Sequence, residues 1–243
     1  MSGHAYFGNN LTKIRHAYVF DNGEYKKLRK AWYYDNGEFK QVWSGASEVS
    51  YYDGDTLLGI EEVDEGEDVL HPSLSTAKEN YTLVGWKQAV YGDKVLELNA
   101  TGEPMVLYAM YLPNTYNAVS DSTYVTGSTS TSNSATPAYQ GGQDLGSSTS
   151  FVLNMREYRN NSVTVVQQNI YSGHLDDDQP WGYGQLDGSD VAKNSSRTFA
   201  NIANGTHVLR TIGHTANEGE ARNTQTLRCY VASIVLSNPT PWT

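Results

Sequence analysis

The stretch that decides the fold is a duplicated hairpin sequence, Ala17-Tyr-Val-Phe-Asp-Asn-Gly-Glu-Tyr-Lys26, followed fourteen residues later by Ala31-Trp-Tyr-Tyr-Asp-Asn-Gly-Glu-Phe-Lys40. In each copy an Asn-Gly dipeptide lies between aromatic and β-branched residues. Asn-Gly favours the type I′ turn of a two-residue hairpin, because both central residues of that turn have positive φ. The duplication therefore predicts two β-hairpins in tandem, and it favours a repeat architecture over an enzyme core.

The composition extends this prediction to the whole chain. The 243 residues include 18 Tyr and 22 Gly, and only 18% of them are charged. Tyrosine favours strands and glycine favours turns, and no stretch shows a sustained 3.6-residue apolar period. The sequence therefore predicts an all-β, β-rich protein with little helix.

The net charge of −10 is unevenly distributed. Basic residues outnumber acidic ones in residues 1–43, whereas acidic residues dominate residues 44–112. An acidic chain is poorly suited to the phosphate backbone, so no nucleic-acid partner is expected. The basic N-terminal ribbon could dock on an acidic partner, or its charges could simply form cross-strand ion pairs.

Cys229 is the single cysteine, and it lies within an apolar run. This placement predicts a buried strand thiol rather than a nucleophile. No segment approaches the roughly 20 apolar residues of a membrane span, and the N-terminus has no apolar signal region. An adhesin-like composition without an export signal is typical of a virion protein, assembled in the host cytoplasm and released by lysis.

Residues 13–45 resemble a segment of tail and other virion proteins from phages and prophages of Gram-positive bacteria. In those proteins, units of the form K-I-(K/R)-K-(A/G)-Y-V…(D/N)-G recur in tandem and end in a Trp-Ser or Phe-Ser step, as Trp43-Ser44 does here. The resemblance implies that residues 1–45, an N-terminal arm and duplicated hairpins, attach the chain to other virion proteins. Two isolated hairpins are marginally stable in water, which favours a homo-oligomer, commonly a trimer in such appendages. A generic exposed β-ribbon is the alternative.

Residues 48–112 resemble the Listeria–Bacteroides repeat, a small β-grasp-like module of internalin-type surface proteins. The resemblance rests on Tyr52-Asp-Gly54, Gly85-Trp86 and Leu107-Tyr-Ala109. Leu83 stands where Phe is usual, and Tyr111 where Trp is commoner. The resemblance implies that this module is a spacer or a protein-interaction module without catalysis. The pattern of apolar residues favours Trp86 as a core anchor over a binding platform.

The C-terminal part is predicted to be a jelly-roll-like β-sandwich. Residues 113–149 are rich in Ser, Thr and Gly and are expected to form a linker or loop. Short strands separated by turn signals follow in residues 150–243, although the sandwich may begin near 115. The predicted fold class is therefore all-β, with an N-terminal β-hairpin ribbon, a small β-grasp-like module and a C-terminal β-sandwich.

The segment 174–190, interpreted as a loop, holds the candidate ligand-binding residues. Trp181 and Tyr183 could offer flat apolar faces to sugar rings, with Gln185 or Asp187 binding the hydroxyl groups. The alternative is a loop that is pinned to the sandwich by its own tryptophan.

The same segment contains a candidate calcium site. Asp176 and Asp178 could supply the hard oxygen ligands that calcium prefers, although the spacing is not that of an EF-hand. The alternative is an ordinary solvated acidic loop. No other cofactor is predicted.

No catalytic residue is predicted. The sequence has no Gly-x-Ser-x-Gly, His-Glu-x-x-His or phosphate-loop motif. His207 and His214 have a poor spacing for a metal site without a third ligand nearby. The chain is therefore not expected to be an enzyme.

Taken together, the residues and the two resemblances predict a bacteriophage virion protein with a structural and adhesive role. The expected location is a tail fibre, a baseplate or a head fibre, with a host surface glycan as the outward partner. One alternative is a bacterial cell-surface or secreted carbohydrate-binding protein. A second is a tail-associated cell-wall hydrolase.

Overall fold

The computed structural model describes residues 4–7, 10–13, 17–28, 30–35, 37–136, 143–172, 181–215 and 224–243. These residues form strands, turns and irregular segments, and none of them lies in a helix, so the predicted all-β fold class is confirmed. The chain divides into two compact units, which are described separately. The first comprises Met1–Leu112 with Pro241–Thr243, and the second comprises Pro113–Thr240.

The first unit begins with three two-stranded antiparallel sheets. In the first copy of the duplication, Asn22 and Gly23 have φ angles of 51° and 89°, as a type I′ turn requires. The predicted ribbon is therefore present, and a further hairpin stands where only an arm was expected. The hairpins are β1 (His4–Phe7) with β2 (Asn10–Lys13), β3 (Ala17–Asp21) with β4 (Glu24–Leu28), and β5 (Lys30–Asp35) with β6 (Glu38–Ser44).

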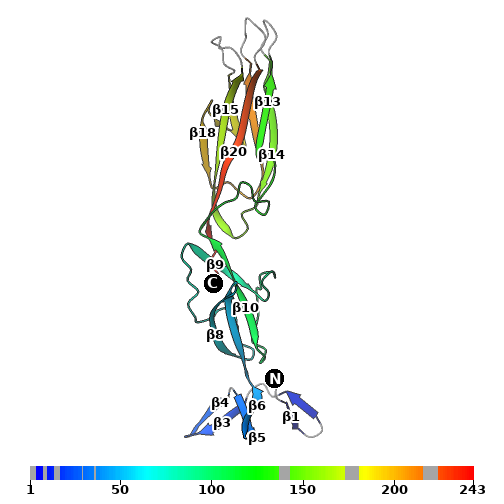
Figure 1. Cartoon of the computed structure of the whole chain (residues 1–243), viewed down its shortest axis with the longest axis vertical. Helices are drawn as coiled ribbons and strands as arrows, with labels where there is room; N and C mark the ends of the chain where they lie inside the picture. The colour runs from blue at the N-terminus through cyan, green and yellow to red at the C-terminus, as the bar shows by residue number, and fades with distance from the viewer. Residues whose placement is uncertain are drawn as a thin grey trace. The chain divides into compact units, whose positions relative to one another are not determined.

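A four-stranded mixed sheet follows in the first unit. Its order is β8-β7-β10-β9, and the two central strands, β7 and β10, are parallel, with Met105 opposite Val49. The first strand of the hairpin β7–β8 pairs in parallel with β10, the last strand of the sheet (Figure 1). This is the strand arrangement of a β-grasp-like module. The strands are β7 (Ala46–Asp53), β8 (Thr56–Asp64), β9 (Tyr81–Lys87) and β10 (Met105–Pro113).

Trp86 lies at the centre of the core of this module. It is fully buried, and its ring meets that of Tyr51 edge-on with centroids 5.1 Å apart. Tyr51 rather than Tyr52 faces the core, because side chains alternate along β7 and the buried Val49 lies two residues before Tyr51. Trp242, from beyond the last strand of the chain, also packs against this core. The buried core residues are Val49, Tyr51, Val69, Leu70, Trp86, Ala100, Leu107 and Ala109.

The second unit is a sandwich of two five-stranded sheets. One has the order β11-β20-β15-β18, with β13 also paired to β20, and the other has the order β12-β14-β19-β16-β17. The strands are β11 (Thr115–Asn117), β12 (Val125–Gly127), β13 (Ser130–Ala135), β14 (Ser147–Leu153), β15 (Tyr158–Ser172), β16 (Trp181–Leu186), β17 (Ser189–Val191), β18 (Ser196–Ala200), β19 (Gly205–His214) and β20 (Thr224–Pro239).

The strand pairing identifies this sandwich as a jelly roll. From β13 onward, the first strand pairs with the eighth, the second with the seventh, the third with the sixth and the fourth with the fifth. Such nested pairing arises when one long antiparallel ribbon folds over itself into two sheets. Figure 1 shows β20 between β13 and β15, as the pairing requires.

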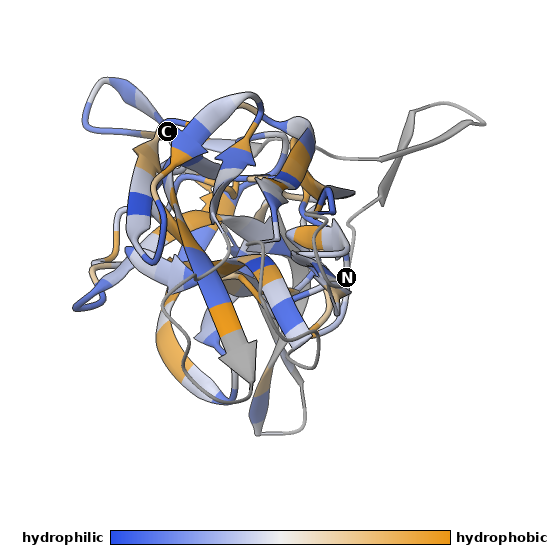
Figure 2. Cartoon of the chain, turned by 90° about the horizontal axis from the view of Figure 1, so that it is seen from above, coloured by the Kyte–Doolittle hydropathy of each residue, from blue (hydrophilic) through white to orange (hydrophobic). Residues whose placement is uncertain are grey.

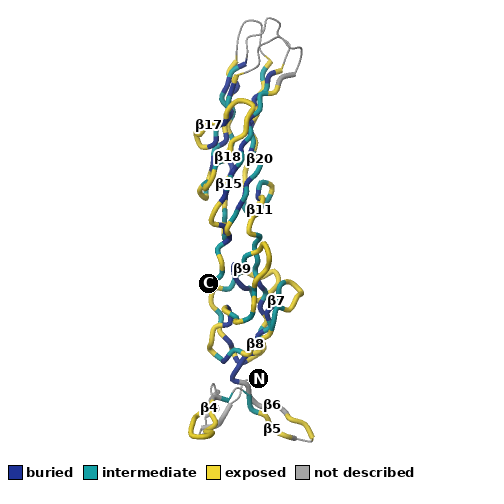
Figure 3. The backbone as a smooth tube through the Cα atoms, turned by 90° about the vertical axis from the view of Figure 1, so that its left-hand side faces the viewer, coloured by how far each residue is buried: buried dark blue, intermediate teal, exposed yellow. Residues whose placement is uncertain are grey.

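Alternation of inward and outward residues places the core between the two sheets. Strand β20 alternates buried and more exposed residues over most of its length, and β19 does the same. Figure 2 shows hydrophilic and hydrophobic residues following one another along the strands, and Figure 3 shows buried positions recurring along β15 and β20. The largest fully buried side chains of this unit are Leu145, Phe151, Leu153, Leu186, Leu209, Leu227, Ile234 and Leu236.

Two segments differ from the interpretation of the sequence. The stretch 113–149 is not a linker, because it contains β11, β12, β13 and the start of β14, and the sandwich begins near residue 115. Residues 181–191 form the hairpin β16–β17 rather than a loop. In both segments Ser or Gly residues occupy strand positions, where pairing with neighbouring strands overrides their weak β-propensity.

Candidate functional site

Strand β16 carries three of the predicted ligand-binding residues on one face of its sheet. Its sequence, Trp-Gly-Tyr-Gly-Gln-Leu, alternates large and small side chains, and burial alternates with it. Trp181, Tyr183 and Gln185 face outwards, whereas the residues between them are buried. Since successive outward residues of a strand are about 7 Å apart, the three side chains form a row.

Two glycines on the inner face of β16 allow the two sheets to approach each other closely. A Cβ atom on Gly182 would lie 2.5 Å from Leu227 Cδ1, and one on Gly184 would lie 2.6 Å from Cys229 Sγ. Both distances are shorter than real Cβ contacts, so larger residues would force the sheets apart. In residues 181–184 of β16 the glycines therefore face the core and the aromatic side chains face outwards, and Leu186 is the large residue on the inner face.

Trp181 forms the end of the row and is joined there by two residues that the sequence did not indicate. It is 56% exposed, and its ring stacks on His214 of β19 with centroids 6.0 Å apart and planes at 22°. The Nδ1 atom of His214 lies 2.9 Å from Oδ1 of Asp144, whose side chain is almost fully exposed. The exposed indole is thus flanked by groups that can form hydrogen bonds.

The other end of the row is polar. Gln185 lies opposite Arg210 of β19 and opposite Asp190 of β17, and its Nε2 donates a 2.8 Å hydrogen bond to Asp190 Oδ1. Between the two ends, Tyr183 lies opposite Ile212. We call the surface formed by Asp144, Trp181, Tyr183, Gln185, Asp190, Arg210, Ile212 and His214 the β16 face.

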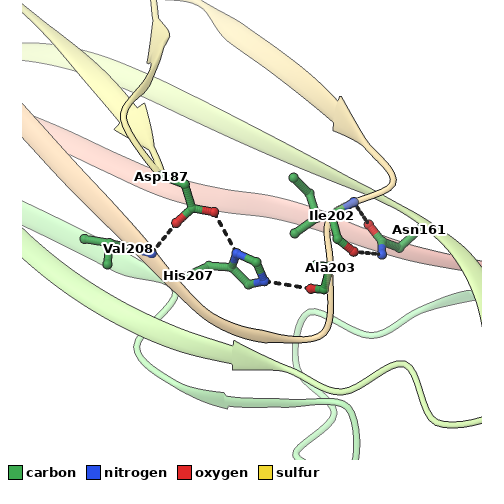
Figure 4. A network of polar contacts seen from close by, with 6 residues as sticks. All are labelled: Asn161, Asp187, Ile202, Ala203, His207 and Val208. Carbon is green, nitrogen blue, oxygen red and sulfur yellow. Dashed lines mark hydrogen bonds and ion pairs between the residues drawn. The ribbon is translucent and has the colours of Figure 1, made fainter.

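Asp187, the fourth predicted ligand-binding residue, is not part of the β16 face. It lies in the turn after β16, six residues from Trp181 along the chain, and its carboxylate is bonded within the fold (Figure 4). Its Oδ1 accepts a 2.8 Å hydrogen bond from the backbone of Val208, and its Oδ2 lies 2.7 Å from Nδ1 of His207. The structure therefore gives Asp187 a role in holding the turn against β19.

His207 extends this network into the sandwich. It is nearly buried, and its Nε2 donates to the carbonyl of Ala203 at 2.8 Å. Beside it, Asn161 accepts a hydrogen bond from the backbone N–H of Ile202 and donates one to the carbonyl of the same residue (Figure 4). A buried polar group is stable only when its hydrogen bonds are made, and these residues satisfy that condition.

The predicted calcium ligands, Asp176 and Asp178, lie outside the described residues, so the calcium site stays a prediction. Within the described ranges, no group of three or more His, Cys, Asp or Glu side chains is placed to hold a metal ion. In the same ranges, no helix is long and apolar enough to cross a membrane. Cys229 is fully buried in the sandwich core, and burial raises the pKa of its thiol to about 11.

The hairpins of the first unit expose matched aromatic pairs. Phe20 faces Tyr25 across β3–β4, and Tyr34 faces Phe39 across β5–β6, each pair with ring centroids 5.0 Å apart. The two pairs occupy equivalent positions in the fourteen-residue repeat. All four side chains are between 62% and 77% exposed. Such a repeated apolar surface is typical of a contact site for another chain.

A cavity in the first unit was not indicated by the sequence. It has a volume of about 510 Å³ and is lined by Asp68, His71 and residues 96–99. His71 Nδ1 is hydrogen-bonded to Asp68 Oδ2, and Asp68 Oδ1 accepts a 2.9 Å bond from the backbone of Leu70. Asp68, Leu70 and His71 belong to one short segment, and no sequence motif marks this segment.

No protein-family model, no curated protein and no solved structure matches this chain. The β16 face and the two repeated hairpins are the features of the described residues that bear on function.

Proposed function

We propose that this chain is a structural and adhesion protein of a bacteriophage virion, without enzymatic activity. The duplicated hairpins attach it to other virion proteins, the β-grasp-like module is a spacer, and the jelly roll contacts the host cell surface. The observation that carries the proposal is the pair of repeated hairpins that expose Phe20 with Tyr25 and Tyr34 with Phe39.

Physical chemistry supports an attachment role for these hairpins. A two-stranded sheet is marginally stable in water, and an exposed aromatic pair leaves apolar surface in contact with solvent. Burial of that surface against another chain contributes free energy in proportion to its area. The tandem repeat offers the same contact twice, which raises the overall affinity for a partner with repeated sites. We expect three copies of the chain to assemble, as is common in virion appendages.

The test is the double variant Tyr25→Ser, Phe39→Ser in the full-length protein. Light scattering should show loss of the trimer, and complementation of the phage or prophage that carries the gene should show at least tenfold lower incorporation into virions. Tyr91→Ser is the matched control, because Tyr91 is a fully exposed tyrosine outside the hairpins. Normal assembly and incorporation of the double variant would overturn the proposed function.

A further inference from the structure

The arrangement of side chains on β16 is the reverse of the one that favours stability. A strand in a sandwich stabilises the fold most when its large apolar residues face the core. In the first four residues of β16, Gly182 and Gly184 face the core, and Trp181 and Tyr183 face outwards. Trp181 is 56% exposed and Tyr183 is partly exposed. Rings left in contact with solvent add less to folding than buried rings, so a contact with another molecule explains these residues better than packing does.

The neighbours of the two aromatic rings identify the chemistry of that contact. The rings lie in a row on a sheet face, with the imidazole of His214 beside one and the side chain of Ile212 beside the other. Hydrogen-bonding groups lie at both ends of the row, Asp144 at one and Gln185 with its neighbours at the other. A ligand that fits must have flat apolar faces at its centre and many hydrogen-bonding groups at its edges.

The charges of the β16 face restrict the ligand further. Arg210 provides one cation, and Asp144 and Asp190 provide two anions. Because this face has no excess of positive charge, it is poorly suited to binding a polyanion. Because charges are interspersed across it, it is also poorly suited to a purely apolar partner. A peptide that adds a strand would bind through backbone groups at a sheet edge, whereas Trp181, Tyr183 and Gln185 present a row of side chains on a sheet face.

We propose that the β16 face binds a neutral oligosaccharide, with Trp181 and Tyr183 stacking on successive sugar rings. Pyranose rings have an apolar face formed by C–H groups and an edge of hydroxyl groups. Aromatic rings contact the apolar face, and carboxylate, imidazole and amide groups bind the hydroxyls. Asp144 and His214 bind hydroxyls at one end of the sugar chain, and Gln185 binds them at the other. This inference rests on the proposed function, since the glycan would belong to the host surface.

The test begins with the full-length protein on an array of neutral and anionic bacterial oligosaccharides, with titration calorimetry on the glycans that bind. We expect binding to neutral glycans of at least three sugar units. Trp181→Ala and Tyr183→Ala should each lower the affinity at least tenfold, because each removes one stacking surface. Asp144→Asn should lower it several-fold, since one carboxylate acceptor is lost.

Two controls separate binding from folding. Tyr91→Ala removes an exposed aromatic ring elsewhere and should leave the affinity unchanged. Trp181→Ala should leave the thermal unfolding temperature within about two degrees of the wild-type value, because its ring is largely exposed. Absence of binding to every neutral glycan, unchanged affinity in both aromatic variants, or binding to anionic glycans alone would overturn the inference.

The glycan test and the assembly test fail independently. A chain that enters virions but binds no neutral glycan would overturn the assignment of the β16 face and leave the attachment role intact. Conversely, a hairpin variant that still assembles would overturn the proposed virion attachment while the glycan titration remained valid. Lower virion incorporation of Trp181→Ala with unchanged glycan affinity would identify the β16 face as a protein interface, against the proposal.

Discussion

The indole of Trp242 lies flat against the imidazole of His71, with ring centroids 5.7 Å apart and ring planes at 16°. Its Nε1 donates a 2.9 Å hydrogen bond to the carbonyl of Leu70, and its backbone N–H donates to the carbonyl of Leu83 at 2.9 Å. The ammonium group of Lys94 lies 5.0 Å from the ring centroid. Residues 241–243 thereby complete the β-grasp-like unit, although they follow the jelly roll in sequence.

The first prediction concerns this contact. Trp242→Ala removes a half-buried ring and one hydrogen bond, so it should lower the free energy of unfolding of the first unit by about 2–4 kcal/mol. Denaturation followed by hydrogen exchange of the β9 amides measures the loss. Tyr91→Ala, which alters an exposed ring of the same unit, should change it by less than about 0.5 kcal/mol. Equal stability of the two variants would contradict the role of Trp242.

The second prediction concerns Trp86. Because this ring is fully buried against Tyr51, Trp86→Ala should cost about 3–5 kcal/mol and unfold most of the first unit. Trp86→Phe keeps an aromatic ring and should cost less. Urea denaturation followed by near-UV circular dichroism distinguishes the two variants. A loss of less than about 0.5 kcal/mol in the unfolding free energy of Trp86→Ala would show that the ring is not the core anchor.

The third prediction concerns the pH dependence of the His71–Asp68 pair. The hydrogen bond to Asp68 and one to the backbone of Thr243 raise the pKa of His71 above its usual 6.5. Burial acts to raise the pKa of Asp68, but hydrogen bonds from His71 and Leu70 outweigh it and hold the pKa below 3.8. A nuclear magnetic resonance titration of the His71 ring should therefore give a value above 6.5, and Asp68→Asn should lower it.

The effect of this pair on stability follows from the signs of the two shifts. Stabilisation from His71 is fully present below pH 6.5 and is lost as the pH rises through its folded-state pKa. Stabilisation from Asp68 is present above pH 3.8 and is lost as the pH falls through its lowered pKa. The pair thus contributes most between these limits. Both side chains are about half exposed, so the contribution is below about 1 kcal/mol. An unchanged pKa of His71 in Asp68→Asn would be the contrary result.

The fourth prediction concerns Cys229. Burial raises the pKa of its thiol to about 11, so the native protein at pH 8 contains almost no thiolate at this position. A thiol reagent such as iodoacetamide should therefore label it only as fast as the sandwich opens. Addition of 8 M urea should accelerate labelling at least a hundredfold. Rapid labelling of the native protein would mean that the thiol is accessible.

The fifth prediction tests the close approach of the two sheets. Gly184→Ala places a Cβ atom 2.6 Å from Cys229 Sγ and should destabilise the sandwich by about 1–3 kcal/mol. Cys229→Ala removes the clashing atom, so the double variant should recover part of that loss. Gly146→Ala is the matched control, because its Cβ would meet nothing closer than 3.9 Å. Additive effects in the double variant would exclude the proposed contact.

Local sequence signals predicted the parts of the fold that are formed by neighbouring residues. The type I′ turn at Asn22-Gly23 follows from the conformational freedom of those two residues, and the hairpin follows from the turn. The burial of Trp86 follows from its place in an apolar strand. Each of these features is determined within about ten residues of sequence.

Features that depend on distant segments could not be predicted in the same way. Pairing of β13 with β20 depends on segments about a hundred residues apart, so a Ser/Thr-rich strand was interpreted as a linker. Trp242 fills a core whose other members precede residue 112, and nothing in its neighbouring sequence indicates this. The candidate site was half predicted: Trp181, Tyr183 and Gln185 share a face, but His214 and Asp144 join them only through strand pairing.

The pairing of β13 with β20 also determines when each part of the molecule can fold during synthesis. The hairpins close within a few residues and can form as soon as they leave the ribosome, because local contacts have a low entropic cost. The jelly roll lacks a central strand until residues 224–239 emerge, and the β-grasp-like unit lacks Trp242 until slightly later. A nascent chain therefore presents its hairpins well before either larger unit is complete. Under the proposed attachment role, a product that stops before residue 224 would occupy attachment sites without a folded jelly roll.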